Sequence, residues 1–463
     1  MHMLKKGRTA LIVSLGLLIA LLCFATTAPA KKLHPKRTLP FNPVIFVHGS
    51  SGSASQFESQ AMRFAVNGYP QHYLQAHEYD STFSINTMAQ VHAGLDDLIA
   101  AILQATGADQ VDLMGHSLGT YVLQLYLATP ERAALVGHYV NIDGAIAPEL
   151  PGGVPTLALW AEHGTPGREI VGAENVWLAG QTHVQAATSA EAFHAMFTFL
   201  ADEAPRTTMI MPDFKGHISI AGRAVIFPQN NGVDGAVLEI HEISGFTGQR
   251  IKRRPAAVYD IDADGNWGPF RAKAGRNYEF VLVREGQEHH FYRQPFIRDN
   301  HFVRLLASPL GGGVGEQMDR DDGQSNLVIQ RDKESLGDQG VNNTILAVNG
   351  VNIVNAATCP IANRTTSFFV YDLYSDTESD VDTPIPYYHA LPFITGVDLY
   401  LPAADPPDDR IRLTLMDRGG NGTLQIINVP NWPSTSHRIS VHFSDFAQWD
   451  TIPTADCGLS LKP

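Results

Sequence analysis

The sequence has few positive charges for its length. Its 463 residues include 33 Lys and Arg against 47 Asp and Glu, which gives a formal net charge of −14. A protein that binds nucleic acid needs a basic surface to contact the phosphates, so this balance argues against such a partner. Charged residues make up 17% of the chain and apolar residues 44%, as is ordinary for a globular protein with sizeable cores. The length predicts two or three domains.

The sequence also has little that suggests a membrane span. The N-terminal apolar run, from Leu11 to Ala25, is short for a span of ~20 residues. Three basic residues precede it, and Ala28-Pro29-Ala30 follows as a small-x-small cleavage site. This pattern predicts a signal peptide over residues 1–30 that is cleaved, and therefore a secreted protein, extracellular or periplasmic. An uncleaved membrane anchor is the alternative.

Cysteine is scarce, with three residues in the whole chain. Cleavage of the signal peptide removes Cys23 and leaves Cys359 and Cys457. Two cysteines in an exported chain favour one disulfide, which would brace the C-terminal region. Two free buried thiols are the alternative.

The sequence contains no complete metal-binding motif. Residues Asp260 to Gly265 match the first half of a calcium loop, but the twelfth position holds Arg271 where the loop needs Glu. An Asp- and Gly-rich hairpin turn is the better interpretation of this segment. The pair His289-His290 does not by itself indicate a metal site. We therefore predict no metal and no organic cofactor.

Residues 31–205 alternate strand-like and helix-like stretches. Short apolar strands are expected at 44–47, 110–114, 138–142, 154–160 and 175–178, and helices at 54–67, 86–106, 118–128 and 189–200. Continuous apolar strands suit a parallel sheet that is covered on both faces. This rhythm predicts an α/β fold with a doubly wound, mostly parallel sheet.

Helical periodicity is nearly absent after residue 217. Short alternating stretches recur there, divided by Gly, Asn, Asp and Pro, which predicts an all-β region of one or two sandwich or barrel modules. We divide it into a small transthyretin-like module over residues 206–300 and a C-terminal β domain over 301–463. Gly311-Gly312-Gly313 looks like a linker near this boundary.

The segment Gly115-His116-Ser117-Leu118-Gly119 lies between an expected strand and an expected helix. A serine at such a junction sits on a sharp turn, and the flanking glycines avoid collisions with the neighbouring strand and helix. This context predicts that Ser117 is a catalytic nucleophile. A plain strand-to-helix turn is the alternative interpretation.

A serine nucleophile needs backbone donors for the oxyanion that forms during the reaction. One N–H should come from Leu118, directly after the serine. The other should come from the loop after an early strand, and Ser50 in the loop His48 to Gly52 is the best candidate. A flexible Gly/Ser loop without this role is the alternative.

The base is expected after the serine in the chain. His163, His183, His194 and His217 are the candidates. His183 lies just beyond the strand at 175–178, at the carboxyl end of the sheet where the nucleophile is also expected. We therefore predict that His183 is the base.

The acid that orients His183 should also lie at this end of the sheet. Asp143 directly follows the strand at 138–142, whereas Glu162 follows the next strand. We predict Asp143, because no residues intervene between it and its strand. Glu162 remains an alternative acid, and a turn-forming Asp-Gly is the alternative to any catalytic role for Asp143.

Several short motifs are spread along the chain. They are Val47-His48-Gly49-Ser50-Ser51-Gly52-Ser53, Gln56-Phe57-Glu58-Ser59-Gln60, Gly68-Tyr69-Pro70, Gly115 to Thr120, Pro130-Glu131-Arg132-Ala133, Ile142-Asp143-Gly144, Thr182-His183-Val184-Gln185, Tyr292 to Asp299, Asn349-Gly350-Val351-Asn352 and Phe443-Ser444-Asp445. With these motifs the chain resembles the exported prokaryotic two-domain lipases and carboxylesterases of the α/β-hydrolase superfamily, of which an archaeal thermophile lipase is the best-known member. The resemblance covers nearly all of the chain after the predicted signal peptide.

The resemblance implies an α/β-hydrolase catalytic domain over residues 31–205 with the triad Ser117, Asp143 and His183. It further implies a short lid and a C-terminal β domain that helps to engage lipid at a lipid–water interface, with no obligate protein partner evident. The expected activity is hydrolysis of acyl esters such as triacylglycerol. Ser50 is more polar than the residue often found in its place, so the acyl chain length stays open.

Two other interpretations remain. A polyester hydrolase or an acyltransferase would use the same residues. A non-catalytic lipid- or surface-binding protein that keeps the hydrolase fold belongs to a different class, and the intact triad and oxyanion loop argue against it.

Overall fold

The computed structural model describes residues 41–162, 164–213, 215–418 and 424–444, which belong to one compact unit. The predicted signal peptide, His163 and Cys457 lie outside these residues. Within them, no helix combines the length and the apolar character needed to cross a membrane.

The N-terminal part contains a six-stranded sheet in which every neighbouring pair of strands is parallel. Its strand order is β2-β1-β3-β4-β5-β6. The predicted fold class is thus confirmed. The edge strand β2 was missed, because its four residues are only partly buried and form no apolar run. The strands are β1 Val44–Val47, β2 Leu74–His77, β3 Val111–His116, β4 Val136–Ile142, β5 Thr156–Ala161 and β6 Glu174–Leu178.

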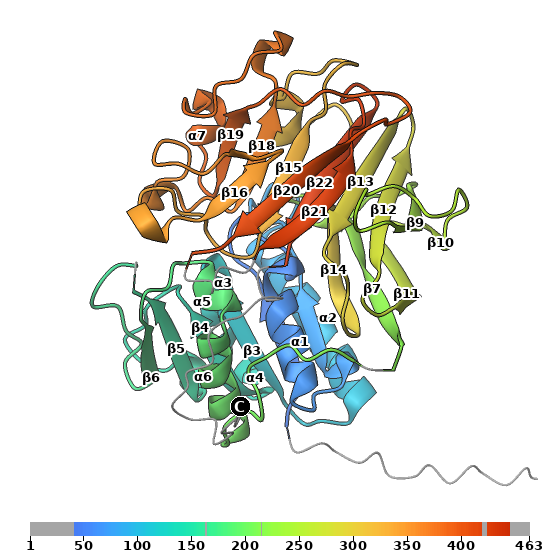
Figure 1. Ribbon diagram of the computed structural model, residues 1–463. Helices are drawn as coiled ribbons and strands as arrows, with labels where there is room; N and C mark the ends of the chain where they lie inside the picture. The colour runs from blue at the N-terminus through green and yellow to red at the C-terminus, as the bar shows by residue number, and fades with distance from the viewer. Residues whose placement is uncertain (1–40, 163, 214, 419–423, 445–463) are drawn as a thin grey trace, which may run out of the picture. The chain divides into compact units, whose positions relative to one another are not determined.

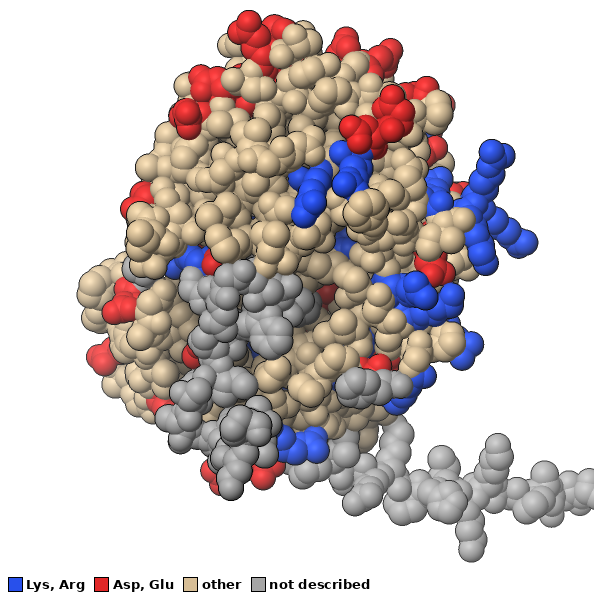
Figure 2. All heavy atoms as spheres, viewed as in Figure 1, with Lys and Arg blue, Asp and Glu red and all other residues tan. Residues whose placement is uncertain are grey.

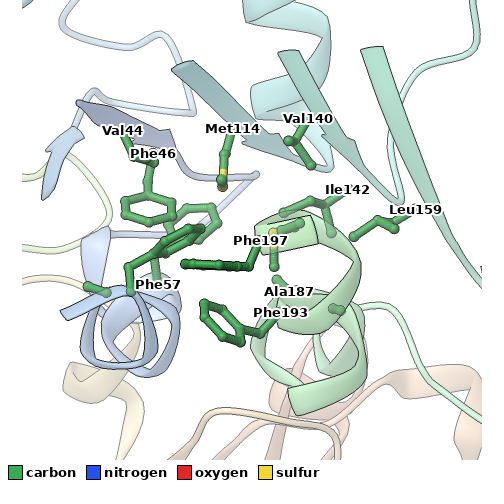
Figure 3. Packing of buried hydrophobic residues seen from close by; sticks show 14 of the residues in the cluster. Val44, Phe46, Phe57, Met114, Val140, Ile142, Leu159, Ala187, Phe193 and Phe197 are labelled. Atoms are coloured by element: carbon green, nitrogen blue, oxygen red, sulfur yellow. The ribbon is translucent and has the colours of Figure 1, made fainter. Parts of the chain in front are cut away.

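Helices cover both faces of this sheet (Figure 1). Phe46 points to the face covered by α1 and α6, where it packs near Phe57, Phe193 and Phe197 (Figure 3). Its neighbour Ile45 points to the face covered by α2 and α3. Each large apolar side chain buried in this way contributes ~1.5–3 kcal/mol. The helices are η1 Ala54–Phe57, α1 Glu58–Val66, η2 Gln71–Tyr73, α2 Met88–Thr106, α3 Leu118–Leu127, α4 Pro130–Ala133, η3 Pro151–Gly153, α5 Gln185–Thr188 and α6 Ala190–Ala201.

The region after residue 216 is dominated by strands, as predicted. An eight-stranded sheet has the order β10-β9-β12-β13-β22-β15-β18-β19, and two four-stranded sheets accompany it. The strands are β7 His217–Ile226, β8 Asn231–Gly232, β9 Val237–Ile243, β10 Ala257–Asp260, β11 Asn266–Lys273, β12 Asn277–Arg284, β13 Gln287–Arg293, β14 Asn300–Ala307, β15 Leu327–Arg331, β16 Ile345–Val348, β17 Val351–Asn352, β18 Ser367–Tyr371, β19 Ile394–Asp398, β20 Arg410–Met416, β21 Gln425–Pro430 and β22 His437–Phe443. The short helices are η4 Val314–Gln317, η5 Gly340–Asn342, η6 Ile361–Asn363, η7 Leu373–Ser375 and α7 Pro386–His389.

The large sheet contributes to two sandwiches. Its part formed by β9 and β12 packs on the sheet β11-β7-β14, and its part formed by β15, β18 and β22 packs on the sheet β16-β20-β21. The two parts join where β13 pairs in parallel with β22. The strand β14 begins at residue 300, where the small module was expected to end, and pairs with β7. The two β modules therefore share one continuous sheet.

Charged side chains are unevenly distributed on the face shown in Figure 2. Asp and Glu side chains gather toward the end where α7 lies, and Lys and Arg side chains toward the side of β9 and β10. The connection between β9 and β10 carries the exposed run Lys252-Arg253-Arg254.

Buried ion pairs join the parallel-sheet part to the β region. Both Glu58 carboxylate oxygens accept hydrogen bonds from Arg293 at 2.7 and 2.8 Å. Glu78 contacts Arg304 at 2.9 Å and Arg223 at 2.7 Å. Burial alone raises the pKa of Glu78, but these two guanidinium groups outweigh it and hold the pKa at about 2. The carboxylate therefore stays charged, and its pairing ties the two parts together.

Cys359 is a buried thiol without a disulfide partner among the described residues. Burial raises the pKa of this thiol to about 12, so it is inert as a nucleophile. The predicted disulfide to Cys457 stays a prediction, because Cys457 lies outside the described residues.

Candidate active site

Ser117 lies on the sharp turn between β3 and α3, with φ 52° and ψ −121°. A positive φ at a residue other than glycine is strained, and such strain persists where the surrounding structure enforces it. Here the start of α3 packs against β1. A Cβ added to Gly119 would lie 2.3 Å from the carbonyl oxygen of Val47, so only glycine fits. The turn therefore has the geometry that exposes a serine hydroxyl at the end of the sheet.

The loop after β1 lies directly against Ser117. A Cβ added to Gly49 would stand 2.9 Å from the Ser117 Cβ. Ser50 is exposed, and both residues line the same cavity as Ser117. Leu118 follows the serine at the start of α3. The structure thus places Ser50 in the cavity that Ser117 lines and Leu118 directly after Ser117, and the role of both as oxyanion donors stays a prediction.

His183 lies beyond β6 and faces Asp143. Its Nδ1 is 2.6 Å from Asp143 Oδ2. Asp143 Oδ1 accepts a hydrogen bond from the Ala161 N–H at 2.9 Å and contacts the Arg168 guanidinium. Burial alone raises the pKa of the Asp143 carboxyl, but the hydrogen bond to His183 and its charge outweigh it and hold the pKa at about 2. The carboxylate is therefore charged at neutral pH.

The other candidates lie elsewhere. Glu162 is exposed, and its carboxylate accepts a hydrogen bond from the Gly180 N–H. His194 is exposed on α6, and His217 is exposed at the start of β7. Of the two carboxylates weighed as the acid, Asp143 is the one that contacts His183.

Sequence reasoning assigned no role to a chain of hydrogen bonds formed by Gln56 and His116, which line the same cavity as Ser117. Gln56 Oε1 accepts a hydrogen bond from the Gly49 N–H at 3.3 Å, and Gln56 Nε2 donates to His116 Nδ1 at 2.8 Å. His116 Nε2 in turn donates to the His183 carbonyl oxygen at 3.0 Å. Burial, followed by the charge of His183, lowers the pKa of His116 to about 3, so the ring is neutral. This chain ties the loop after β1 to the loop that carries His183.

The C-terminal β domain also holds the His183 loop. Glu334 follows β15 and is fully buried. Its Oε1 accepts the Val184 N–H at 2.7 Å and its Oε2 the Gln185 N–H at 3.2 Å, while the Thr182 hydroxyl also donates to it. The Glu334 carboxylate thus accepts three hydrogen bonds from residues that precede and follow His183 in the chain. No sequence signal indicated this contact, because Glu334 and Thr182 are 152 positions apart.

Ser117 and His183 line a cavity of about 390 Å³ that is walled by both parts of the molecule. The β region contributes apolar side chains that include Met318, Leu391 and Phe393. The Phe393 ring stacks on the His183 ring, with centroids 6.1 Å apart. Serine, imidazole and carboxylate at the end of a parallel sheet, beside an apolar cavity, are the groups used in nucleophilic acyl transfer.

The parallel sheet, the serine turn after β3 and the histidine after β6 define the α/β-hydrolase class. Residues 41–128 match the family model described as lipase (class 2), and residues 216–310 match the lipase C-terminal domain. A further model, described as a C-terminal domain, matches residues 313–447. The matches to two lipase models support a two-domain lipase of the α/β-hydrolase type and a hydrolase of ester bonds, in agreement with the family resemblance.

Three solved structures are similar to about a third of this chain. The metagenome-derived lipolytic enzymes LipS and LipT are represented by a chain with 13% identity, a TM-score of 0.28 and coverage of 35% of this chain and 95% of that one. Aspergillus fumigatus lipase B has 16% identity and a TM-score of 0.28, with coverage of 36% and 54%. The lin2722 gene product of Listeria innocua has 14% identity and a TM-score of 0.28, with coverage of 36% and 97%.

Proposed function

We propose that this protein is a serine carboxylic ester hydrolase, a lipase or carboxylesterase, that cleaves acyl esters through an acyl-enzyme. The observation that carries the proposal is the 2.6 Å contact between His183 Nδ1 and the buried Asp143 carboxylate, beside the cavity that Ser117 also lines. Such a contact leaves Nε2 of His183 as the nitrogen that accepts a proton.

In the proposed reaction, Ser117 Oγ attacks the acyl carbon while His183 takes the hydroxyl proton. The Ser50 and Leu118 N–H groups stabilise the oxyanion. His183 then gives its proton to the leaving alcohol. Water, activated by the same histidine, releases the acid. Asp143 stabilises the imidazolium in both steps.

The apolar part of the cavity suits an acyl chain. Met318, Leu391 and Phe393 come from the β region, so this region would take part in substrate binding. Transfer of an acyl chain from water to such side chains is favourable by ~0.8 kcal/mol per methylene group. This supports esters with an extended acyl chain as substrates.

A panel of soluble esters with short to long acyl chains, together with an emulsified triglyceride, tests the proposal. We expect kcat/KM to rise with chain length until the cavity is filled. A fluorophosphonate probe should label the protein once, at Ser117. A protein that neither cleaves any of these esters nor reacts with the probe would instead be a non-catalytic binding protein.

Glu334→Gln tests whether the β domain positions the His183 loop. A glutamine amide has one oxygen, so it cannot accept hydrogen bonds at both of the positions that the Glu334 oxygens occupy. At one of these positions its NH₂ group would face a backbone N–H, which is also a donor. We expect kcat to fall by about 10- to 100-fold, because misplacement of a reacting group by about 1 Å costs this much. The KM should change little, since Glu334 does not line the cavity.

Glu285→Gln is the matched control, because Glu285 is an exposed carboxylate in the β region. It should leave kcat and the rate of fluorophosphonate labelling unchanged, whereas Glu334→Gln should slow labelling. Equal labelling rates in the two variants would refute a positioning role for Glu334. Thermal melting of both variants separates this effect from unfolding.

A further inference from the structure

Three side chains of types that can bind a metal meet where β13 joins β22, within the sheet shared by the two β modules. Glu288 and His290 lie on β13 and His437 begins β22. His290 Nε2 is 2.9 Å from His437 Nδ1 and 3.7 Å from Glu288 Oε2. One ligand atom from each residue lies within 4.8 Å of the other two. Two imidazole nitrogens and a carboxylate oxygen thus converge on one point.

The buried histidine of this cluster is held in one orientation. His290 Nδ1 is 2.8 Å from the buried Glu279 Oε1 and donates its proton to that carboxylate. Its Nε2 therefore faces His437 and Glu288. The Trp432 ring stacks on His290, with centroids 4.6 Å apart and an angle of 13° between the planes. A carboxylate behind a histidine, fixing its tautomer, is the usual arrangement around a metal-bound histidine.

The distances suit a tetrahedral ion. Ligands at ~2.0–2.1 Å from zinc stand ~3.3–3.5 Å from one another, and the observed 2.9 and 3.7 Å fall on either side of this spacing. A simple hydrogen bond between the two imidazoles accounts for the first distance. That hydrogen bond does not account for the Glu288 carboxylate 3.7 Å from the same nitrogen, whereas an ion shared by all three side chains does.

The charged groups around the cluster favour a cation. The carboxylates of Glu288 and Glu279 outnumber the one guanidinium group, that of Arg250, which contacts Glu279 at 2.6 Å. Glu288 and His437 are half-buried, so an ion can enter from solvent.

We propose that Glu288, His290 and His437 form a binding site for a divalent transition metal of the zinc type, with water in the fourth position. Imidazole and carboxylate ligands favour Zn²⁺ or Co²⁺ over Mg²⁺ or Ca²⁺, which take oxygen ligands. The ion joins β13 of the segment matched by the lipase C-terminal domain to β22 of the following segment. It acts as a clamp between the two β modules and takes no part in the proposed ester hydrolysis.

The sequence did not indicate this site. The pair His289-His290 alone shows no ligand spacing, and the next ligand, His437, is 147 positions away. Of the adjacent histidines, only His290 points into the cluster. His289 contacts Ser440 on the other side of the strand.

Binding of Co²⁺ and Zn²⁺ to the chelator-treated full chain tests the proposal. Titration with Co²⁺ should give the strong visible absorption of a four-coordinate ion with one ion per chain, and Zn²⁺ should displace it. Zn²⁺ at about 100 times its Kd should raise the thermal melting midpoint by about 3 °C. Ca²⁺ should give neither effect.

Glu288→Gln and His437→Ala should each weaken the binding of Co²⁺ and Zn²⁺ by at least about tenfold. Removal of a residue that only hydrogen-bonds to a metal ligand already costs this much, and these two residues are themselves proposed ligands. His194→Ala, at an exposed histidine on α6, is the matched control and should bind as the parent does. Absence of Co²⁺ absorption, or binding that survives Glu288→Gln unchanged, would overturn the proposal. Glu288 is partly exposed, so its variant answers the question even where His437→Ala does not fold.

Discussion

Ser117→Ala should lower kcat for ester cleavage by about 10⁶-fold, the loss that follows removal of a triad nucleophile. The substitution removes only the hydroxyl that would attack the acyl carbon. The backbone conformation at this position, with φ 52°, is equally strained for serine and alanine, so the fold should persist. Initial rates on a soluble ester, with active-site titration by a fluorophosphonate, measure the effect.

Ser50→Ala is the control for this variant. Ser50 is predicted to act through its backbone N–H, which alanine keeps, so activity should stay within a few-fold of the parent. Substantial ester cleavage by Ser117→Ala, with a melting curve like that of the parent, would show that another residue is the nucleophile.

Asp143→Asn should reduce kcat by about 10⁴-fold, because an amide favours the wrong tautomer of His183 and does not stabilise its charged form. The Arg168 guanidinium contacts the same carboxylate and would disfavour a charged His183 once Asp143 is neutral. Asn suits the backbone here, since Asp143 has φ 44°, a region that Asn adopts more readily than most residues. Steady-state kinetics on a soluble ester measure the loss.

Glu162→Gln distinguishes the two acids considered from the sequence. Its carboxylate contacts the Gly180 N–H and lies on the surface, so the variant should keep kcat within a few-fold. A larger loss in Glu162→Gln than in Asp143→Asn would move the acid role to Glu162. Both variants retain the side-chain volume, so differences in packing do not confuse the comparison.

Local patterns predicted the parallel sheet well, for a physical reason. Strands such as β1 and β5 are buried on both faces, so each is a nearly continuous apolar run that can be recognised in the sequence alone. The strand β2 lies at the sheet edge with two half-buried residues, and it left no such run. In the β region the strands were visible but their partners were not, because pairing across a sheet depends on distant segments. The shared sheet through β13 and β22 therefore came only from the structure.

By itself the sequence determined the residue types and their order along the chain: a serine between two glycines at a strand–helix junction, an aspartate after the next strand and a histidine after the last one. The closeness of these three residues follows from chain connectivity, since the carboxyl ends of parallel strands meet at one edge of the sheet. Tertiary structure alone decided which carboxylate contacts His183, how Glu334 holds its loop and how His437 meets His290. Each of these contacts joins residues that are far apart in the chain, so its energy depends on packing that no local pattern records.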